Sequence, residues 1–147
     1  MLSSRDAICQ LIYTYAERID AGDFPGVGDL LAHAEITFEG YDTSVSGPEA
    51  VTKLYTTTTR RYADGTPCTK HQMTNVIVEV SDDEETATSR SYFTVLQAVP
   101  GQLALQPVIA GRYVDRFQRI GHDWRFTGMH VVVELVGDLS AHLLQAL

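Results

Sequence analysis

The chain has 147 residues, 44% of them hydrophobic, and its 19 acidic and 11 basic side chains give a net charge of −8. This length fits one domain over residues 1–147, and the apolar content is high enough to build a core, which excludes a disordered chain. An acidic surface repels phosphate groups, so we expect neither nucleic acid nor an anionic membrane as a partner.

Cysteine content and the first residues bear on the compartment. Cys9 and Cys68 are too few for a disulfide framework, and neither has CxxC or CxxH spacing. We therefore expect two free thiols in a reducing compartment. Residues 1–10 lack the apolar core of a secretory signal, and no apolar run approaches the ~20 residues of a membrane span. The sequence predicts a cytoplasmic protein.

The first half of the chain reads as mostly helical. A helix is predicted over residues 4–19, with Ser3 as its cap and Ala21-Gly22 at its end. Its apolar positions form one helical stripe: Ile8, Leu11, Ile12, Tyr15 and Ile19. Three shorter elements follow: a weak helix at 23–32, a strand at 35–40 and a helix at 48–62 that begins at Pro48.

The second half is rich in β-branched and aromatic residues. Four long strands are predicted, joined by short polar turns, over 69–80, 86–99, 103–120 and 123–136. A C-terminal helix is possible over 138–147. The order α-α-β-α-β-β-β-β predicts an α+β fold, a curved, cone-shaped antiparallel sheet with helices enclosing a pocket.

Three stretches together resemble a known family. They are the helix end ERIDAGDF at 17–24, the strand start TKHQMTNV at 69–76, and the hairpin GRYVDRFQRIGHDWRF at 111–126. In this order they resemble the SnoaL-like branch of the nuclear-transport-factor-two-like superfamily, nearest to the scytalone dehydratase-like subfamily. The resemblance implies a cone-shaped α+β barrel with a deep pocket. It does not fix the activity, because this fold hosts dehydratases, isomerases, cyclases, binding proteins and structural subunits.

The resemblance also implies a catalytic pair, Asp20 at the end of the first helix and His71 on the first long strand. Histidine titrates near neutral pH, and a hydrogen-bonded aspartate fixes its tautomer and raises its basicity. Such a pair in an apolar pocket can move a proton next to a carbonyl without a metal or cofactor. Local sequence alone leaves two alternatives open, a solvated helix-end carboxylate at Asp20 and a structural or exposed histidine at His71.

Further residues are candidates for the pocket wall. Asn75 shares the face of His71 by period two, and His130 shares a face with Trp124 in the last strand. His130 is either a polar wall residue or a satisfied core histidine, and Tyr92 either packs in the core or donates to an oxyanion. Which face of its strand lines the pocket stays open. The full candidate set for substrate binding is Tyr15, Phe24, Phe38, Tyr41, Leu54, Tyr55, Asn75, Tyr92, Trp124 and His130.

Two departures from the dehydratase pattern limit the inference. The family member has a tyrosine immediately before its helix-end aspartate, where this chain has Ile19. It has a second tyrosine on the first short strand, where Phe38 stands here. The two hydroxyls that would orient a water and polarise a carbonyl are thus missing at these positions. Scytalone dehydration itself is not expected, while proton transfer by Asp20 and His71 remains possible.

Two main functions are compatible with these features. The first is a cofactor-free lyase or isomerase acting on a small hydrophobic cyclic or aromatic carbonyl compound. The alternative is a non-catalytic ligand-binding or scaffold protein of the same fold. A helper subunit like the small subunit of ring-hydroxylating oxygenases is a third option, although no extra docking segment is evident. The apolar run around Val131–Leu135 predicts a homo-oligomer, a dimer or trimer formed through the outer sheet face.

Overall fold

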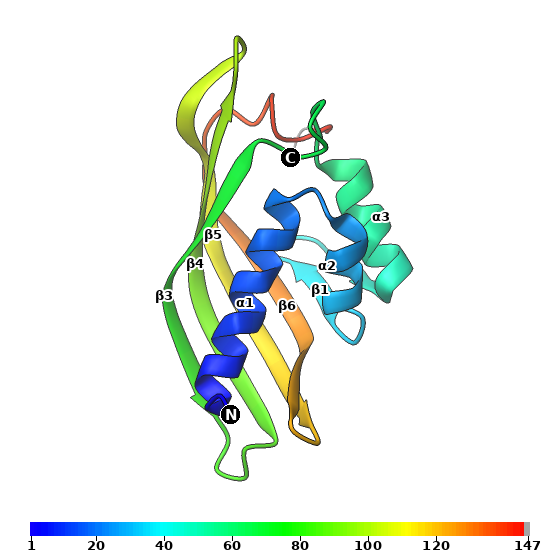
Figure 1. Cartoon of the computed structure of the whole chain (residues 1–147), viewed down its shortest axis with the longest axis vertical. Coiled ribbons are helices and arrows are strands. Elements are labelled where there is room, and N and C mark those ends of the chain that lie inside the picture. The colour runs from blue at the N-terminus through cyan, green and yellow to red at the C-terminus, as the bar shows by residue number, and fades with distance from the viewer. Residues whose placement is uncertain (146–147) are drawn as a thin grey trace.

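A computed structural model of the chain describes residues 1–145. Three helices, α1 (Ser4–Asp20), α2 (Phe24–Leu30) and α3 (Pro48–Thr58), lie against one curved sheet (Figure 1). The sheet comprises two short strands, β1 (Glu35–Phe38) and β2 (Ser44–Ser46), and four long ones. The long strands are β3 (Thr69–Val80), β4 (Thr86–Val99), β5 (Leu103–Ile120) and β6 (Asp123–Val136).

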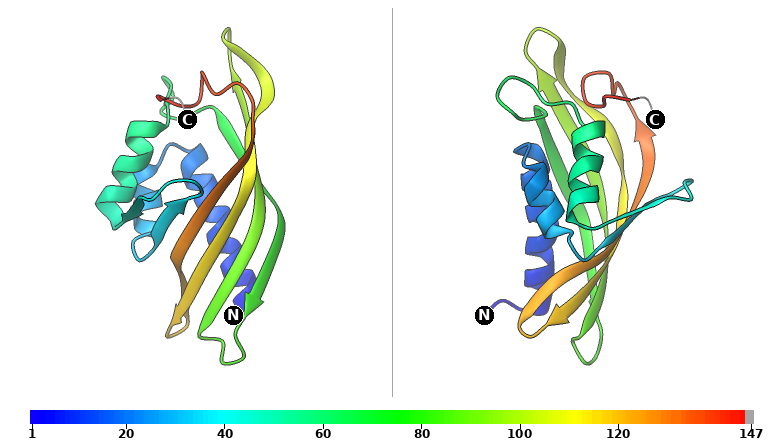
Figure 2. Two further views of the ribbon diagram at one scale, coloured as in Figure 1. Left: turned by 180° about the vertical axis from the view of Figure 1, so that it is seen from behind. Right: turned by 90° about the vertical axis from the view of Figure 1, so that its right-hand side faces the viewer.

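The sheet is mixed and does not close into a barrel. Its strand order is β2-β1-β6-β5-β4-β3. The long strands form the predicted antiparallel meander, but β1 pairs with β6 in parallel. The expected α+β class with a curved, largely antiparallel sheet is therefore confirmed, and the β1–β6 pair is its one parallel pairing among the described residues. Helix α1 crosses the concave face, and α2 and α3 pack together beside β1 and β2, as two further views show (Figure 2).

Local contacts fix both ends of α1. At the start of the helix, the Ser3 side chain accepts a hydrogen bond from the backbone N–H of Asp6. At its end Gly22 adopts φ +73°, and the N–H of Asp23 donates to the carbonyl of Arg18, which closes the helix. A Cβ at position 22 would lie 2.0 Å from the carbonyl oxygen of Gly65, so only glycine fits there. Asp20 is thereby held in the last turn.

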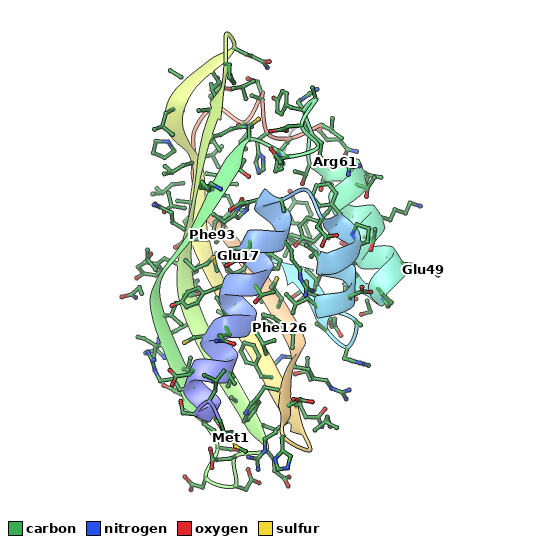
Figure 3. All side chains as sticks on the ribbon, viewed as in Figure 1. Met1, Glu17, Glu49, Arg61, Phe93 and Phe126 are labelled. Carbon is green, nitrogen blue, oxygen red and sulfur yellow. The ribbon has the colours of Figure 1, made fainter. Side chains whose placement is uncertain are left out.

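The core fills the space between α1 and the concave face. Ile8, Ile12, Tyr15 and Ile19 form the buried stripe of α1, as predicted. Phe93 and Phe126 lie on the sheet face that α1 covers and mark its upper and lower parts (Figure 3). Packing of this stripe, not helix propensity alone, stabilises the helix on the sheet.

Two expectations about the helices need correction. Helix α3 ends at Thr58, not Tyr62, because Thr59 is already extended and pairs with Leu143 in an isolated β-bridge. The hydroxyls of Thr56, Thr57 and Thr58 bond back to carbonyls in the preceding turn, a pattern that weakens a helix. The predicted C-terminal helix is absent from residues 138–145, and its remaining positions, 146–147, lie outside the described residues.

The segment 138–145 instead runs across the upper end of the sheet, above the end of α1 (Figures 1 and 2). We call it the C-terminal strap. It is fixed from both sides, since Gln97 Nε2 donates to the carbonyl of Ala141 at 2.9 Å and the N–H of Leu144 donates to the carbonyl of Thr58 at 2.9 Å. The backbone N–H of Arg60 donates to the carbonyl of His142 at 2.8 Å.

No helix among the described residues is long and apolar enough to cross a membrane.

Candidate functional site

Asp20 and His71 are in direct contact at the upper end of the concave face. The last turn of α1 presents Asp20 to the start of β3, and Asp20 Oδ1 lies 2.6 Å from His71 Nδ1. The backbone N–H of His71 donates to Asp20 Oδ2 at 2.8 Å, and Thr69 Oγ1 donates to Asp20 Oδ1 at 2.9 Å. The carboxylate thus has three donors, all from β3, which hold it in one orientation.

The electrostatics of this contact determine the histidine tautomer. Burial by itself raises the pKa of Asp20, but the hydrogen bonds and charge of His71, with the bond from Thr69, outweigh it and leave the pKa below its usual value. Asp20 is therefore ionised near neutral pH and can only accept hydrogen bonds. His71 Nδ1 must then carry the proton, which leaves the lone pair on Nε2. An imidazole in this state is a general base with a fixed orientation.

The pair is withdrawn from solvent. The side chains of His71 and Asp20 are only 6% and 10% exposed. His142 on the C-terminal strap packs its ring edge-on against His71, with the ring centroids 6.3 Å apart. Burial, then the nearby His71, lowers the pKa of His142 to about 4, so this second imidazole is neutral at physiological pH.

Two hollows of the structure lie away from this pair. One of about 420 Å³ is at the opposite end of the sheet, near the β3–β4 turn, where Val80, Ala87 and Phe117 form part of its wall. Another of about 90 Å³ lies between Ile77 and Val114 on the outer face. Neither includes Asp20 or His71.

Three tyrosines gather in the interior, and one of them lies on the helix that carries Asp20. Tyr15 on α1 has its hydroxyl oxygen 2.6 Å from that of Tyr55 on α3 and 3.5 Å from that of Tyr113 on β5. Phe24 on α2 packs on the ring of Tyr55, with centroids 6.1 Å apart. The structure thus brings three of the ten candidate wall residues together: Tyr15, Phe24 and Tyr55. Tyr113 on β5, which was not among these candidates, joins them.

Several other candidates are placed away from this interior. Tyr41 is 61% exposed in the segment between β1 and β2, and Tyr92 is 52% exposed on the outer sheet face. The open question about the faces of β4 is thereby answered, because Ser91 and Phe93 point inward. Phe38 and Leu54 are half-buried, and Phe38 packs against the core. Trp124 is buried, but it pairs with Arg119 near the β5–β6 turn, at the end of the sheet far from Asp20.

Two further corrections have a shared physical cause, a β-bulge that shifts the period-two alternation. Asn75 adopts φ +52° at a register shift between Thr74 and Ile77, and its side chain is exposed and not on the inner face of His71. A second shift between Arg116 and Phe117 moves His130 to the outer face. There His130 contacts Thr37 Oγ1 and Glu39 Oε2, each at 2.7 Å.

The structure adds residues that sequence interpretation did not assign to the site. His142 on the C-terminal strap is 6% exposed, whereas His33 and His122 are exposed. Asp115 on β5 is 1% exposed, and its Oδ1 has no hydrogen-bond partner within residues 1–145. One pattern could have revealed Asp115. It follows Gly111 and Tyr113 and precedes Phe117 in the buried phase of β5, where a carboxyl group is unusual.

Burial raises the pKa of Asp115 well above its ordinary value, which favours the protonated form of this carboxyl group in the folded chain. In the unfolded chain it ionises above about pH 3.9, and the folded state therefore loses stability as the pH rises. We expect Asp115→Asn, which mimics the neutral acid, to gain stability relative to the parent by up to about 1.4 kcal/mol for each pH unit above about 4. Chemical unfolding at pH 4 and pH 8 measures this difference, and a pH-independent value would contradict a protonated Asp115.

Metal ligation has no evident place in this arrangement. Within residues 1–145, no group of at least three His, Cys, Asp or Glu side chains is placed to hold a metal ion. Asp20, His71 and His142 are close neighbours, but the oxygens of Asp20 are engaged with β3. What the site offers is an ionised carboxylate, an oriented imidazole and a group of hydroxyl donors.

The fold and these residues match one family. The SnoaL-like domain profile matches residues 1–130, and the chain belongs to this family. The match covers α1, the whole of β3 and most of the sheet, and therefore includes both Asp20 and His71. Among curated proteins, no sequence matches this chain.

Solved structures share the fold at low identity. An NTF2-like protein with a cystatin-like fold from Novosphingobium aromaticivorans is 22% identical, with a TM-score of 0.72 over 94% of this chain and 86% of its own. A candidate scytalone dehydratase from the same organism is 17% identical, with a TM-score of 0.70 over 91% and 86%. LinA is 20% identical, with a TM-score of 0.71 over 93% and 90%. At these identities the likeness establishes the fold alone.

Proposed function

We propose that this protein is a cofactor-free lyase or isomerase that transfers a proton on a small hydrophobic cyclic or aromatic carbonyl compound. The observation that carries the proposal is the 2.6 Å contact between Asp20 Oδ1 and His71 Nδ1, with the carboxylate fixed by two further donors. Asp20 orients His71 and balances its charge, and His71 is the general base and acid. Dehydration is favoured, followed by isomerisation and aldol-type cyclisation.

The chemistry follows from the tautomer. His71 Nε2 takes a proton from the carbon next to a carbonyl, and the electron pair of that C–H bond moves into an enolate. The imidazolium is stabilised by the ionised Asp20. The proton then returns to another carbon in an isomerisation, or goes to a departing hydroxyl in a dehydration. Because Ile19 and Phe38 replace two tyrosines of the scytalone dehydratase pattern, scytalone itself is not the proposed substrate.

Solvent exchange tests the proposal without knowledge of the final product. The protein is incubated in D₂O with a panel of cyclic, aromatic and polyketide-like ketones, and deuterium incorporation next to the carbonyl is followed by NMR. At least one ketone should exchange faster than in buffer, because proton abstraction is the first step of every reaction proposed here. A panel in which no ketone exchanges faster with the protein would refute the proposal.

A non-catalytic binding or scaffold role is the second candidate. It is favoured by the low exposure of the pair, 6% for His71 and 10% for Asp20, and by the position of the hollows elsewhere. The same ketone panel separates the two functions. Binding in a thermal-shift assay, without exchange of any bound compound, indicates the binding protein.

We also propose a homo-oligomer, a dimer or trimer, that pairs through the outer face of the sheet. Apolar side chains remain exposed there, including Ile77 at 38%, Tyr92 at 52% and Val114 at 39%. Light scattering coupled to size exclusion should give two or three times the 16.2 kDa of one chain. Val114→Lys should shift the mass to that of a monomer, whereas Ala50→Lys, on the exposed side of α3, should not. A monomeric parent protein would contradict this prediction.

A further inference from the structure

The hollow of about 420 Å³ near the β3–β4 turn is a second place where a small molecule fits. We call it the turn hollow. It lies at the lower end of the sheet in Figure 1, far from the Asp20–His71 pair, and all four long strands contribute to its wall. Its volume is within the range of about 300–1,000 Å³ that is typical of ligand sites. The polar residues of its wall are Glu79, Ser81, Thr86, Thr88, Arg116 and Thr127.

The strand register places these polar side chains on the outer face of the sheet. One row of paired residues crosses the four long strands and consists of Glu79, Thr88, Arg116 and Gly128. Residues that pair directly across antiparallel strands point to the same side of the sheet. Arg116 is exposed, whereas the next residue, Phe117, is buried under the helices. The row therefore points away from α1 and from the core.

A β-bulge shapes this part of the outer face. Arg116 pairs with Gly128 and Phe117 pairs with Phe126, so Thr127 is an extra residue on β6. A bulge bends its strand and increases the local twist. Gly128, beside the bulge, brings no side chain to fill the space. The bend and the missing side chain together leave room on the outer face at this point.

The guanidinium group of Arg116 lies over the backbone of Gly128. A Cβ at position 128 would be 2.5 Å from Arg116 Nε and 2.6 Å from its Nη2, so the guanidinium occupies the space of a side chain there. Arg116 forms no ion pair with any residue in 1–145, whereas Arg112 on the same strand pairs with Glu134 at 3.6 Å. Arg116 thus brings a planar set of N–H donors and an unbalanced positive charge to the turn hollow.

Hydroxyl groups surround this charge. Thr86, Thr88 and Thr127 each bring one hydroxyl to the wall, and a hydroxyl can donate one hydrogen bond and accept others. The carboxylate of Glu79 is also in the wall, but it accepts a hydrogen bond from Arg90 Nη1 at 3.2 Å, which balances its charge. The wall therefore has the donors that an anion needs, and one positive charge to neutralise it.

The charges nearby favour a ligand with a single negative charge. The turn next to the hollow carries four acidic residues, Asp82–Glu85, and the whole chain has a net charge of −8. Such a field repels phosphate and other multiply charged anions. A carboxylate has one charge, and its two oxygens match the geometry of a guanidinium group through two parallel hydrogen bonds. The apolar part of the wall suits a ring, which brings apolar area at a low cost in conformational entropy.

We propose that the turn hollow binds a small aromatic carboxylate. Arg116 binds the carboxylate group, the threonine hydroxyls complete its hydrogen bonds, and the ring lies on the apolar part of the wall. This site is separate from the proposed catalytic pair and does not rest on the proposed function. It is also distinct from the residues of the proposed pairing face, because Ile77, Tyr92 and Val114 do not belong to its wall.

Two matched probes, 2-naphthoate and 2-naphthamide, test this inference. They share one ring system and nearly one shape, but only the first is an anion. In calorimetric titrations at low ionic strength, the parent protein should bind 2-naphthoate about tenfold or more tightly than 2-naphthamide, as for a hydrogen bond assisted by charge. Arg116→Gln should remove this preference. Arg112→Gln, which removes the same charge from the same face of β5, is the control and should retain it.

Gly128→Ala provides a second variant that changes no charge. The atoms that its Cβ would meet within 3 Å are Nε, Nη2 and Cζ of Arg116, which lie at the end of a flexible side chain. Position 128 does not have a positive φ, so alanine fits the backbone. We expect this variant to unfold like the parent in chemical unfolding and to lose most of the preference for 2-naphthoate, because the guanidinium is displaced from its place.

The remaining outcomes decide the site and the ligand class. His71→Ala should keep the preference, and its loss in that variant would assign the bound 2-naphthoate to the Asp20–His71 pair and overturn the inference. Displacement of 2-naphthoate by an equal concentration of inorganic phosphate would overturn the assignment to a carboxylate. Equal affinity of the parent for the two probes, no binding of either, or an unchanged preference in a folded Arg116→Gln variant would each overturn the turn hollow as a binding site.

Discussion

Replacing His71 with alanine is expected to slow ketone α-proton exchange by a factor on the order of 10²–10⁴, the usual contribution of a positioned general base. The reason is geometric. Asp20 accepts the Nδ1 proton of His71 at 2.6 Å, so Nε2 is the basic nitrogen of this pair. NMR exchange in D₂O, with the best ketone of the panel, measures the change directly.

The variant should remain folded. Asp20 keeps two of its three donors in His71→Ala, the backbone N–H of residue 71 and Thr69 Oγ1. Loss of the third costs about 1–3 kcal/mol of stability, which thermal unfolding will show. His122→Ala, an exposed histidine in the β5–β6 turn, is the matched control and should exchange like the parent. Exchange by His71→Ala within a few fold of the parent would exclude His71 as the base.

The variant Asp20→Asn tests whether the Asp20 carboxylate sets the tautomer of His71 or merely lies next to it. The amide oxygen can still accept from Thr69 or from the backbone of β3, so the local structure is kept. Its NH₂ group, facing Nδ1, favours the opposite tautomer and places the proton on Nε2, where the base is needed. We expect a rate loss comparable to that of His71→Ala with little change in ketone affinity. Rapid exchange by a folded Asp20→Asn variant would show that the carboxylate does not set the tautomer.

The elements were predictable because their patterns are local. The bounds of the four long strands agree with the sequence prediction, since each strand ends at a polar or glycine-containing turn such as Ser81–Glu85 or Gly121-His122. The end of α1 was likewise readable from Ala21-Gly22. The parallel pairing of β1 with β6 was not, because it joins segments about 90 residues apart and leaves no local trace.

The site was predictable only in part, for two physical reasons. Asp20 and His71 followed from a family pattern, whereas Asn75 and His130 were assigned by strict alternation along a strand. Bulges in β3 and β6 interrupt that alternation, and each moved its residue off the inner face. A bulge depends on the pairing of two strands, so a period count along one strand cannot locate it.

His142 could not be identified from the sequence, yet it produces the second large expected effect. Its ring is 6% exposed on the C-terminal strap and lies against His71, and its Nδ1 has no partner among the described residues. Burial and the adjacent His71 lower its pKa to about 4, from an ordinary value of 6.5. A neutral histidine is favoured at this position, because a charged one would lose its hydration and face the charge of a protonated His71.

The lowered pKa of His142 fixes the direction in which its contribution to folding stability changes with pH. Below about pH 6.5 the unfolded chain binds a proton at His142 that the folded chain does not bind until about pH 4, so the contribution of His142 to stability falls as the pH falls through this window, opposite in sign to that of Asp115. The full loss corresponds to about 3 kcal/mol. Asp20 contributes only at lower pH, because its folded pKa is depressed and its unfolded value is about 3.9.

Leucine has a similar volume to histidine and no titratable group. Between pH 7 and pH 4, the free energy of unfolding of His142→Leu should therefore decrease by about 3 kcal/mol less than that of the parent, as measured by chemical unfolding. His33→Leu, at an exposed position, should follow the parent. Amide hydrogen exchange provides a local readout, because the N–H of Leu144 is protected by the carbonyl of Thr58 only while the strap is closed. As the pH is lowered, the protection of this N–H in the parent should fall before that of the amides in β4 and β5. In His142→Leu it should stay constant. Identical pH profiles for the parent and His142→Leu would show that His142 does not control the strap.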